Sequence, residues 1–83
     1  MDDKAIIIFR MTKRNVEKDL EVPLGISAND LVIALNSAYA LGIDTQDINN
    51  CYLKAEHPTC LLKGTGLLSE FGVRNGTVIY YTE

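Results

Sequence analysis

The sequence is poor in the residues that mark secreted and membrane-spanning proteins. It has 83 residues, two cysteines and no tryptophan, and no wholly apolar run is longer than that of Ala5–Phe9. Two cysteines are too few for a disulfide framework, and this run is far shorter than the roughly 20 residues of a membrane-spanning helix. The first residues, Met-Asp-Asp-Lys, do not resemble a secretory signal. We therefore expect a cytoplasmic protein with reduced thiols and no membrane insertion.

Positive charge is also scarce. Eight Lys and Arg residues stand against eleven Asp and Glu residues, for a net charge of -3. Nucleic-acid binding needs a cationic surface that displaces counterions from phosphates. The basic cluster of Arg10, Lys13 and Arg14 falls at a predicted turn, where solvated charges are common. The composition thus argues against a nucleic-acid partner.

What the chain has is apolar side chains in periodic patterns. Hydrophobic residues make up 47% of the sequence, which is typical of a folded chain, and the length predicts a single domain over residues 1–83. The segment Lys4–Met11 alternates like a strand with two faces. We assign its inner face to Ala5, Ile7, Phe9 and Met11, and its outer face to Lys4, Ile6, Ile8 and Arg10.

A second strand and a helix are expected next. Val16–Val22 alternates apolar with acidic residues and forms a hairpin with the first strand, with Lys18 interrupting the inner face and reaching to its rim. Ser27 is a good N-cap for a helix over about Ala28–Ala40. Gly42 is then expected as the glycine that ends this helix.

The remainder predicts three further strands. They are Cys51–Ala55, Cys60–Lys63 and Thr77–Thr82, with one helical turn at Leu67–Phe71 and an Asn75-Gly76 turn before the last strand. This order indicates an α+β fold of β-grasp type: a mixed five-stranded sheet with the first and last strands parallel at its centre and one main helix on one face. The predicted core is Ile7, Phe9, Leu20, Val22, Leu31, Leu35, Leu53, Leu62, Leu68, Ile79 and Tyr81.

The stretch Leu67–Gly76, which leads into a hydrophobic strand, resembles the corresponding stretch of ubiquitin-like proteins. More narrowly, the chain is similar over about Lys4–Tyr81 to the small bacterial YukD/EsaB-like family. That resemblance implies a cytoplasmic accessory of type VII (WXG-type) secretion, without catalysis. The sequence ends Tyr80-Tyr81-Thr82-Glu83 rather than in the Gly-Gly tail that conjugation or sulfur transfer requires, so a ubiquitin-like modifier or sulfur carrier is the disfavoured alternative.

Three constellations could carry chemistry, and each has a simpler interpretation. Cys51, His57 and Cys60 lack the close spacing and the fourth ligand of a zinc site, and a Cys–His nucleophile has only Glu56 to orient it. Gly64-Thr65-Gly66 beside Lys63 reverses the order of a phosphate-binding loop. We expect no catalytic residue, no metal and no cofactor, and therefore no enzyme.

The remaining candidate is a surface. The outer-face residues of the central strands should form a contiguous apolar patch with a basic rim, which is typical of an interface. The predicted protein-binding residues are Ile6, Ile8, Arg10, Tyr52, Lys54, Val78 and Tyr80. A shift of one residue in the alternation would instead bury the isoleucines. In ubiquitin-like domains this sheet face is the usual docking surface, so we expect a protein-binding adaptor, with a homodimer that buries the same patch as the alternative.

Overall fold

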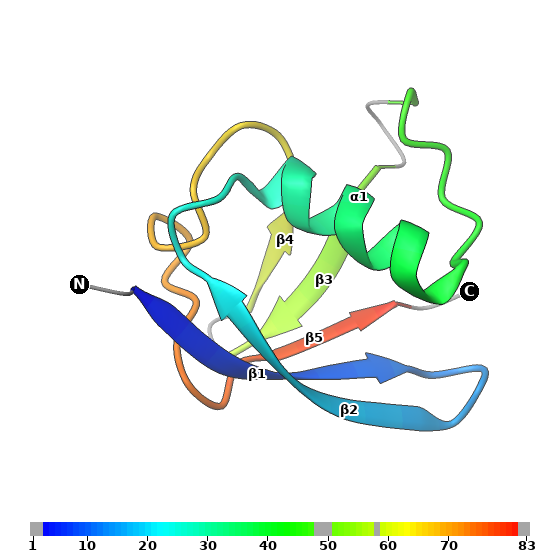
Figure 1. Ribbon diagram of the computed structural model, residues 1–83, viewed down its shortest axis with the longest axis horizontal. Coiled ribbons are helices and arrows are strands. Elements are labelled where there is room, and N and C mark those ends of the chain that lie inside the picture. The colour runs from blue at the N-terminus through cyan, green and yellow to red at the C-terminus, as the bar shows by residue number, and fades with distance from the viewer. Residues whose placement is uncertain (1–2, 48–50, 58, 82–83) are drawn as a thin grey trace.

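The computed structural model describes residues 3–47, 51–57 and 59–81, which form a sheet with one helix packed across it (Figure 1). The hairpin strands are β1 (Lys4–Met11) and β2 (Val16–Pro23), and the helix α1 (Ala28–Tyr39) follows them. Three short strands complete the sheet: β3 (Leu53–Glu56), β4 (Cys60–Leu62) and β5 (Val78–Tyr81).

The strand order is β2-β1-β5-β3-β4. Strands β1 and β5 run parallel at the centre, where Ile8 lies beside Val78, and every other neighbouring pair is antiparallel. A parallel pair needs a long crossover connection, and here the segment with α1 supplies it. The predicted β-grasp architecture is confirmed.

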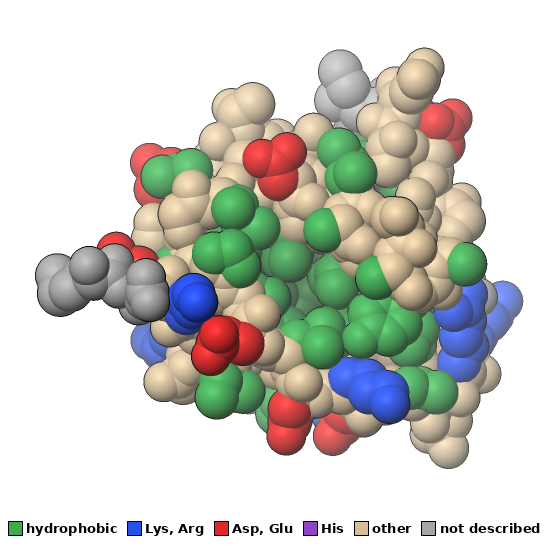
Figure 2. Space-filling model, in the orientation of Figure 1, with side chains coloured by type: hydrophobic (Ala, Val, Ile, Leu, Met, Phe, Trp, Pro, Cys, Tyr) green, Lys and Arg blue, Asp and Glu red, His purple; other side chains and the backbone are tan. Residues whose placement is uncertain are grey.

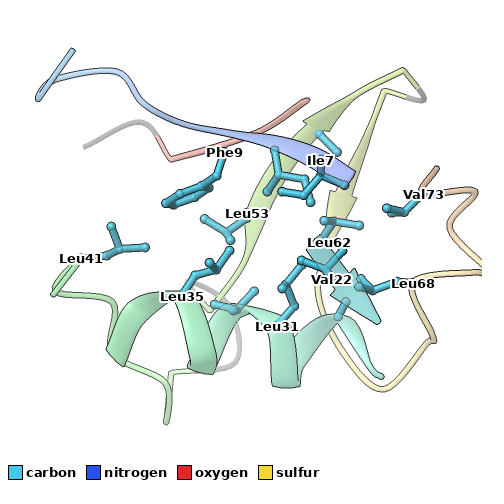
Figure 3. Packing of buried hydrophobic residues seen from close by; sticks show 14 of the residues in the cluster. Ile7, Phe9, Val22, Leu31, Leu35, Leu41, Leu53, Leu62, Leu68 and Val73 are labelled. Atoms are coloured by element: carbon cyan, nitrogen blue, oxygen red, sulfur yellow. The ribbon is translucent and has the colours of Figure 1, made fainter. Parts of the chain in front are cut away.

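One core fills the space between the sheet and α1 (Figure 3). Ile7 and Phe9 of β1 and Leu53 of β3 are buried from the sheet side, while Leu31 and Leu35 point from the helix toward the sheet. The Phe9 and Tyr39 rings add a tilted aromatic contact at 5.2 Å between centroids. Of the predicted core residues, only Leu20 and Tyr81 are partly exposed, because they lie at the margins of the packed layer.

The start of α1 agrees with the prediction and is also stabilised by hydrogen bonds to a distant loop. Ser27 Oγ accepts a hydrogen bond from the Asp30 N–H at 3.0 Å, as an N-cap does. The N–H groups of Ala28 and Asn29 donate to the carbonyls of Gly66 and Gly64, at 2.8 and 2.9 Å. The Gly64–Gly66 loop therefore presents carbonyl acceptors to the helix, whereas a phosphate-binding loop presents N–H donors.

The end of α1 differs from the prediction. The helix stops at Tyr39, and Ala40, rather than Gly42, takes the left-handed conformation that closes it, with φ of 51°. Arg14 from the β1–β2 turn donates to the carbonyls of Tyr39 and Ala40 at 2.6 and 3.0 Å. Arg14 is exposed at a turn, as the sequence predicts, but it also has defined partners because the turn comes close to the helix end.

Several strand boundaries also differ from the sequence prediction. Strand β2 ends at Pro23, β3 at Glu56 and β4 at Leu62, each one residue from the predicted end. Cys51 and Tyr52 precede β3 rather than belonging to it, since the ladder with β4 begins at Leu53. Strand β5 starts at Val78 rather than Thr77. Thr77 belongs to the preceding turn, which is closed by a hydrogen bond from the Thr77 N–H to the Arg74 carbonyl. Residues 48–50, Pro58 and Thr82, which the sequence places in a loop, a strand break and the last strand, lie outside the described residues.

Candidate protein-binding surface

The alternation of β1 places its two faces as predicted. Ala5, Ile7, Phe9 and Met11 are buried beneath α1, whereas Ile6 and Arg10 are exposed and Ile8 is half-buried on the opposite side of the sheet. That opposite side, here called the outer face, has no helix over it in the described part of the chain (Figure 1). The alternative in which the isoleucines are buried under the helix is therefore excluded.

The register brings most of the predicted residues together. In the parallel pair, Ile8 lies beside Val78 and Arg10 beside Tyr80. Across the antiparallel pair, Lys54 lies beside Tyr80. Neighbouring positions on one face of a sheet have Cβ atoms about 5 Å apart, so these five side chains form one continuous surface across three strands.

The other two predicted residues lie at its margins. Ile6 is 52% exposed. The β1–β5 pairing begins at Ile8 and Val78, so Ile6 lies before the start of β5, beside the turn that leads into that strand. Its N–H donates to Asn75 Oδ1 at 2.8 Å, and its carbonyl accepts from the Gly76 N–H at 3.0 Å. Tyr52 is half-buried and precedes β3 by one residue, so no strand pairing fixes its place in the row.

Sequence reasoning missed one apolar member of this face. Leu61 of β4 is 44% exposed and lies beside Lys54 in the ladder. The signal was present, because Leu62 is a core residue and its neighbour in a strand must face the other way. Leu61 thus extends the apolar surface to the edge strand β4.

The rim of the outer face is less basic than the sequence suggests. Arg10 Nη2 lies 2.8 Å from Glu17 Oε2, and Arg10 Nε also donates to that oxygen at 2.9 Å. Lys4 pairs with Glu21 at 3.7 Å. Both acidic partners come from β2, so the cations of β1 are largely neutralised on that flank, while Lys54 lies beside Tyr80 on the other flank.

The three chemical constellations do not assemble into a site. Among residues 3–47, 51–57 and 59–81, no group of three His, Cys, Asp or Glu side chains is placed to hold a metal ion. Cys51 and Cys60 are free thiols. Burial raises the pKa of both thiols, and the carboxylates of Asp44 and Asp47 raise that of Cys51 further. Both effects disfavour the nucleophilic thiolate.

The stretch Leu67–Gly76, in which the resemblance to ubiquitin-like proteins was noted, has a structural role. Leu68 and Val73 are buried, and Gly72 and Gly76 adopt positive φ values of 82° and 89°. Together with the Asn75 bond to β1, these features turn the chain sharply and deliver it into β5 beside β1. Glycine is favoured where φ is positive, which gives the two glycines of the motif a conformational reason.

No helix in the described ranges has the length and apolar character needed to cross a bilayer.

Comparison with known proteins identifies the fold. No protein-family model and no curated protein sequence matches the chain. Among solved structures, a ubiquitin-like domain from tubulin-binding cofactor B superposes with a TM-score of 0.77 at 19% identity, covering 100% of this chain and 92% of that one. The C-terminal ubiquitin-like domain of mouse tubulin-specific chaperone e gives 0.75 at 11% identity, covering 98% and 87%.

Another ubiquitin-like domain matches with a lower TM-score. The ubiquitin-like domain of Plasmodium falciparum Dsk2 gives a TM-score of 0.59 at 18% identity, covering 96% of this chain and 97% of that one. At these identities the likeness concerns the backbone arrangement alone. The chain has the ubiquitin-like β-grasp fold.

Proposed function

We propose that this chain is a non-catalytic protein-binding domain that docks a partner through its outer face. The observation that carries the proposal is the run Ile8, Val78, Tyr80 and Lys54 across the three central strands, on the side of the sheet away from α1. Ile6 and Leu61 add exposed apolar area at the two ends of this run. A contiguous apolar surface on a small domain is typical of an interaction site.

The character of the surface favours a protein partner. Tyrosine supplies a large, rigid contact area, and a central apolar strip with polar margins is the usual anatomy of an interface. The ubiquitin-like fold supports the same conclusion, because such domains commonly act by binding other proteins. The raised pKa values of the two thiols give no support to a cysteine nucleophile, which agrees with a binding role rather than an enzymatic one.

For the pathway, we propose a cytoplasmic accessory role in type VII secretion. The support is the similarity of Lys4–Tyr81 to the YukD/EsaB-like family, and above all the Leu68–Gly76 stretch. The partner would then belong to the secretion machinery, of which the FtsK-like ATPase is the first candidate. Genes for that ATPase and for small WXG-type substrates beside the gene for this chain would support the assignment.

The experiment measures binding of the chain to the soluble domains of the ATPase encoded in the same genome, by isothermal titration. Ile8→Asp and Tyr80→Asp each place a carboxylate in the apolar run, and we expect affinity to fall by at least about tenfold. Ile33→Asp is the matched control, because Ile33 is 41% exposed but lies on α1. Circular dichroism confirms that each variant is folded.

The outcomes separate the two levels of the proposal. Equal affinity of folded Ile8→Asp, Tyr80→Asp and wild-type chains would exclude the outer face as the docking site. Failure of the ATPase to bind at all would exclude that partner. Light scattering at low concentration tests the homodimer: a dimer that Ile8→Asp dissociates would show that the outer face serves self-association.

A further inference from the structure

A second apolar surface lies on the other side of the sheet, in a groove between α1 and β2. In Figure 2 hydrophobic side chains gather in a hollow at the centre of the view, between the positions that α1 and β2 occupy in Figure 1. The groove has a volume of about 400 Å³. The residues that line it include Leu20 and Val22 of β2 and Leu31, Ala34, Leu35 and Ala38 of α1.

Small side chains keep the groove open on its helix side. Ala34 and Ala38 are spaced four residues apart, so they lie one above the other along α1. Both are exposed, whereas Leu35 between them is buried in the core. A methyl group at these two positions leaves apolar volume beside β2 that a larger side chain would fill.

The backbone of β2 beside the groove lies at the edge of the sheet, where no further strand of the described residues pairs with it. In β1 the Ile8 N–H donates to the Thr77 carbonyl and the Ile6 carbonyl accepts from Gly76, so the even-numbered residues point toward β5. The odd-numbered residues of β1 therefore point toward β2, and their partners there are Val16, Lys18, Leu20 and Val22. It follows that Glu17, Asp19 and Glu21 direct their N–H and C=O groups away from the sheet, at its edge.

These three residues also carry an acidic row along the same edge. Their side chains lie on the outer face, because they alternate with Leu20 and Val22, which line the groove. Glu17 and Glu21 pair with Arg10 and Lys4 on the β1 side. Asp19, midway between them and beside Ile8, has no ion pair among the described residues.

We propose that this edge binds an extended polypeptide segment as an added strand, in which apolar residues alternate with lysine or arginine. Side chains of the added strand that lie beside Leu20 and Val22 enter the groove, and those beside Glu17, Asp19 and Glu21 meet the acidic row. Opposite charges in neighbouring positions stabilise strand pairing, and like charges destabilise it. A second copy of β2 is a poor occupant for this reason, since it brings the same acidic row.

The probe is a fluorescein-labelled, blocked eight-residue peptide in which valine alternates with lysine, titrated into the full chain by fluorescence anisotropy. We expect saturable binding, and about tenfold weaker binding of the peptide in which glutamate replaces lysine. A third peptide of the same composition, with its four valines consecutive, controls for general attraction to an acidic protein. Hydrogen exchange of the Glu17, Asp19 and Glu21 amides should slow in the complex, because they gain carbonyl partners.

Variants locate the binding. Ala38→Leu fills the groove and should weaken binding of the valine–lysine peptide by at least about fivefold, whereas Ser37→Leu, exposed on the same helix, should leave it unchanged. Asp19→Lys should bring the affinities of the lysine and glutamate peptides together. Tyr80→Asp lies on the outer face and should have no effect on either peptide.

Several results would overturn the proposal. These are equal affinity for the alternating and the valine-block peptides, equal affinity of the Ala38→Leu and wild-type chains, or unchanged exchange at the three β2 amides. Loss of peptide binding in Tyr80→Asp would assign the peptide to the outer face instead.

Discussion

Arg14 in the β1–β2 turn donates a 2.6 Å hydrogen bond to the carbonyl of Tyr39 at the end of α1, 25 residues along the chain. A second bond from the same guanidinium reaches the Ala40 carbonyl at 3.0 Å. The last turn of α1 contains no basic residue of its own. Arg14 therefore supplies, from another element, the cation that complements the helix dipole and the donors that its terminal carbonyls need.

Replacing Arg14 should destabilise the domain. Arg14→Ala removes both bonds, and we expect the free energy of unfolding to fall by about 1–2 kcal/mol. The loss is smaller than for buried charged hydrogen bonds, because these two are exposed to solvent. Arg14→Lys keeps the charge but not the forked donor, so it should recover less than half of the loss. Urea denaturation measures both, and Lys13→Ala, in the same turn, is the control. Equal stability of Arg14→Ala and Lys13→Ala would contradict the prediction.

A buried hydroxyl ties the start of β5 to the β3–β4 turn. Thr77 is fully buried; its Oγ1 donates to the His57 carbonyl at 2.8 Å and accepts from the Arg74 N–H at 3.0 Å. Thr77→Val keeps the shape but leaves both backbone groups unpaired, so we expect a loss of about 1–3 kcal/mol in thermal or urea unfolding. The exposed Thr59→Val is the matched control. A Thr77→Val variant as stable as that control would show that the hydroxyl contributes nothing.

Backbone strain at Ala40 can be relieved. Ala40 has φ of 51°, a left-handed conformation that costs an alanine energy and a glycine very little. Ala40→Gly should raise the free energy of unfolding by about 0.5–1 kcal/mol, the net of relieved strain and greater freedom in the unfolded chain. Gly42→Ala should lower the free energy of unfolding, because Gly42 has φ of 80°, which is unfavourable for alanine. A lower melting temperature for Ala40→Gly would refute this account of the helix end.

Short-range patterns in the sequence predicted the layers of this fold well. In β1 the period of two, with charges at both ends of one face, identified the buried side, and Ser27 identified the start of α1. The same patterns missed Val32, which lies on α1 and is completely buried but is not among the predicted core residues. The facing of a helix depends on how it crosses the sheet, which no local spacing encodes.

The features that escaped prediction are contacts between distant segments. The Gly64 and Gly66 carbonyls at the start of α1, and Arg14 at its end, come from loops more than 20 residues away. The outer face could be predicted more fully from the sequence. Once the faces of β1 are assigned correctly and β1 is paired in parallel with β5, Ile8 and Val78 are expected to be neighbours. Leu61 follows from the same logic, because Leu62 was correctly assigned to the core and neighbours in a strand face opposite sides; only its place beside Lys54 required the register of β4.

The two thiols should make the stability of the domain fall at alkaline pH. Burial, reinforced at Cys51 by Asp44 and Asp47, raises the pKa of both thiols in the folded state. The thiols of the unfolded chain therefore lose their protons at a lower pH than those of the folded chain. The contribution of the protonated thiols to the free energy of unfolding is fully present below a pH of about 8.5 and is lost as pH rises through their folded-state pKa values. We expect the free energy of unfolding to drop more steeply between about pH 8 and 10 in the wild-type chain than in a Cys51→Ala/Cys60→Ala variant. Parallel pH profiles of stability for the two chains would contradict the role given to the thiols. A second measurement is the rate of alkylation over the same pH range, which should be slower for the buried Cys51 than for the half-exposed Cys60.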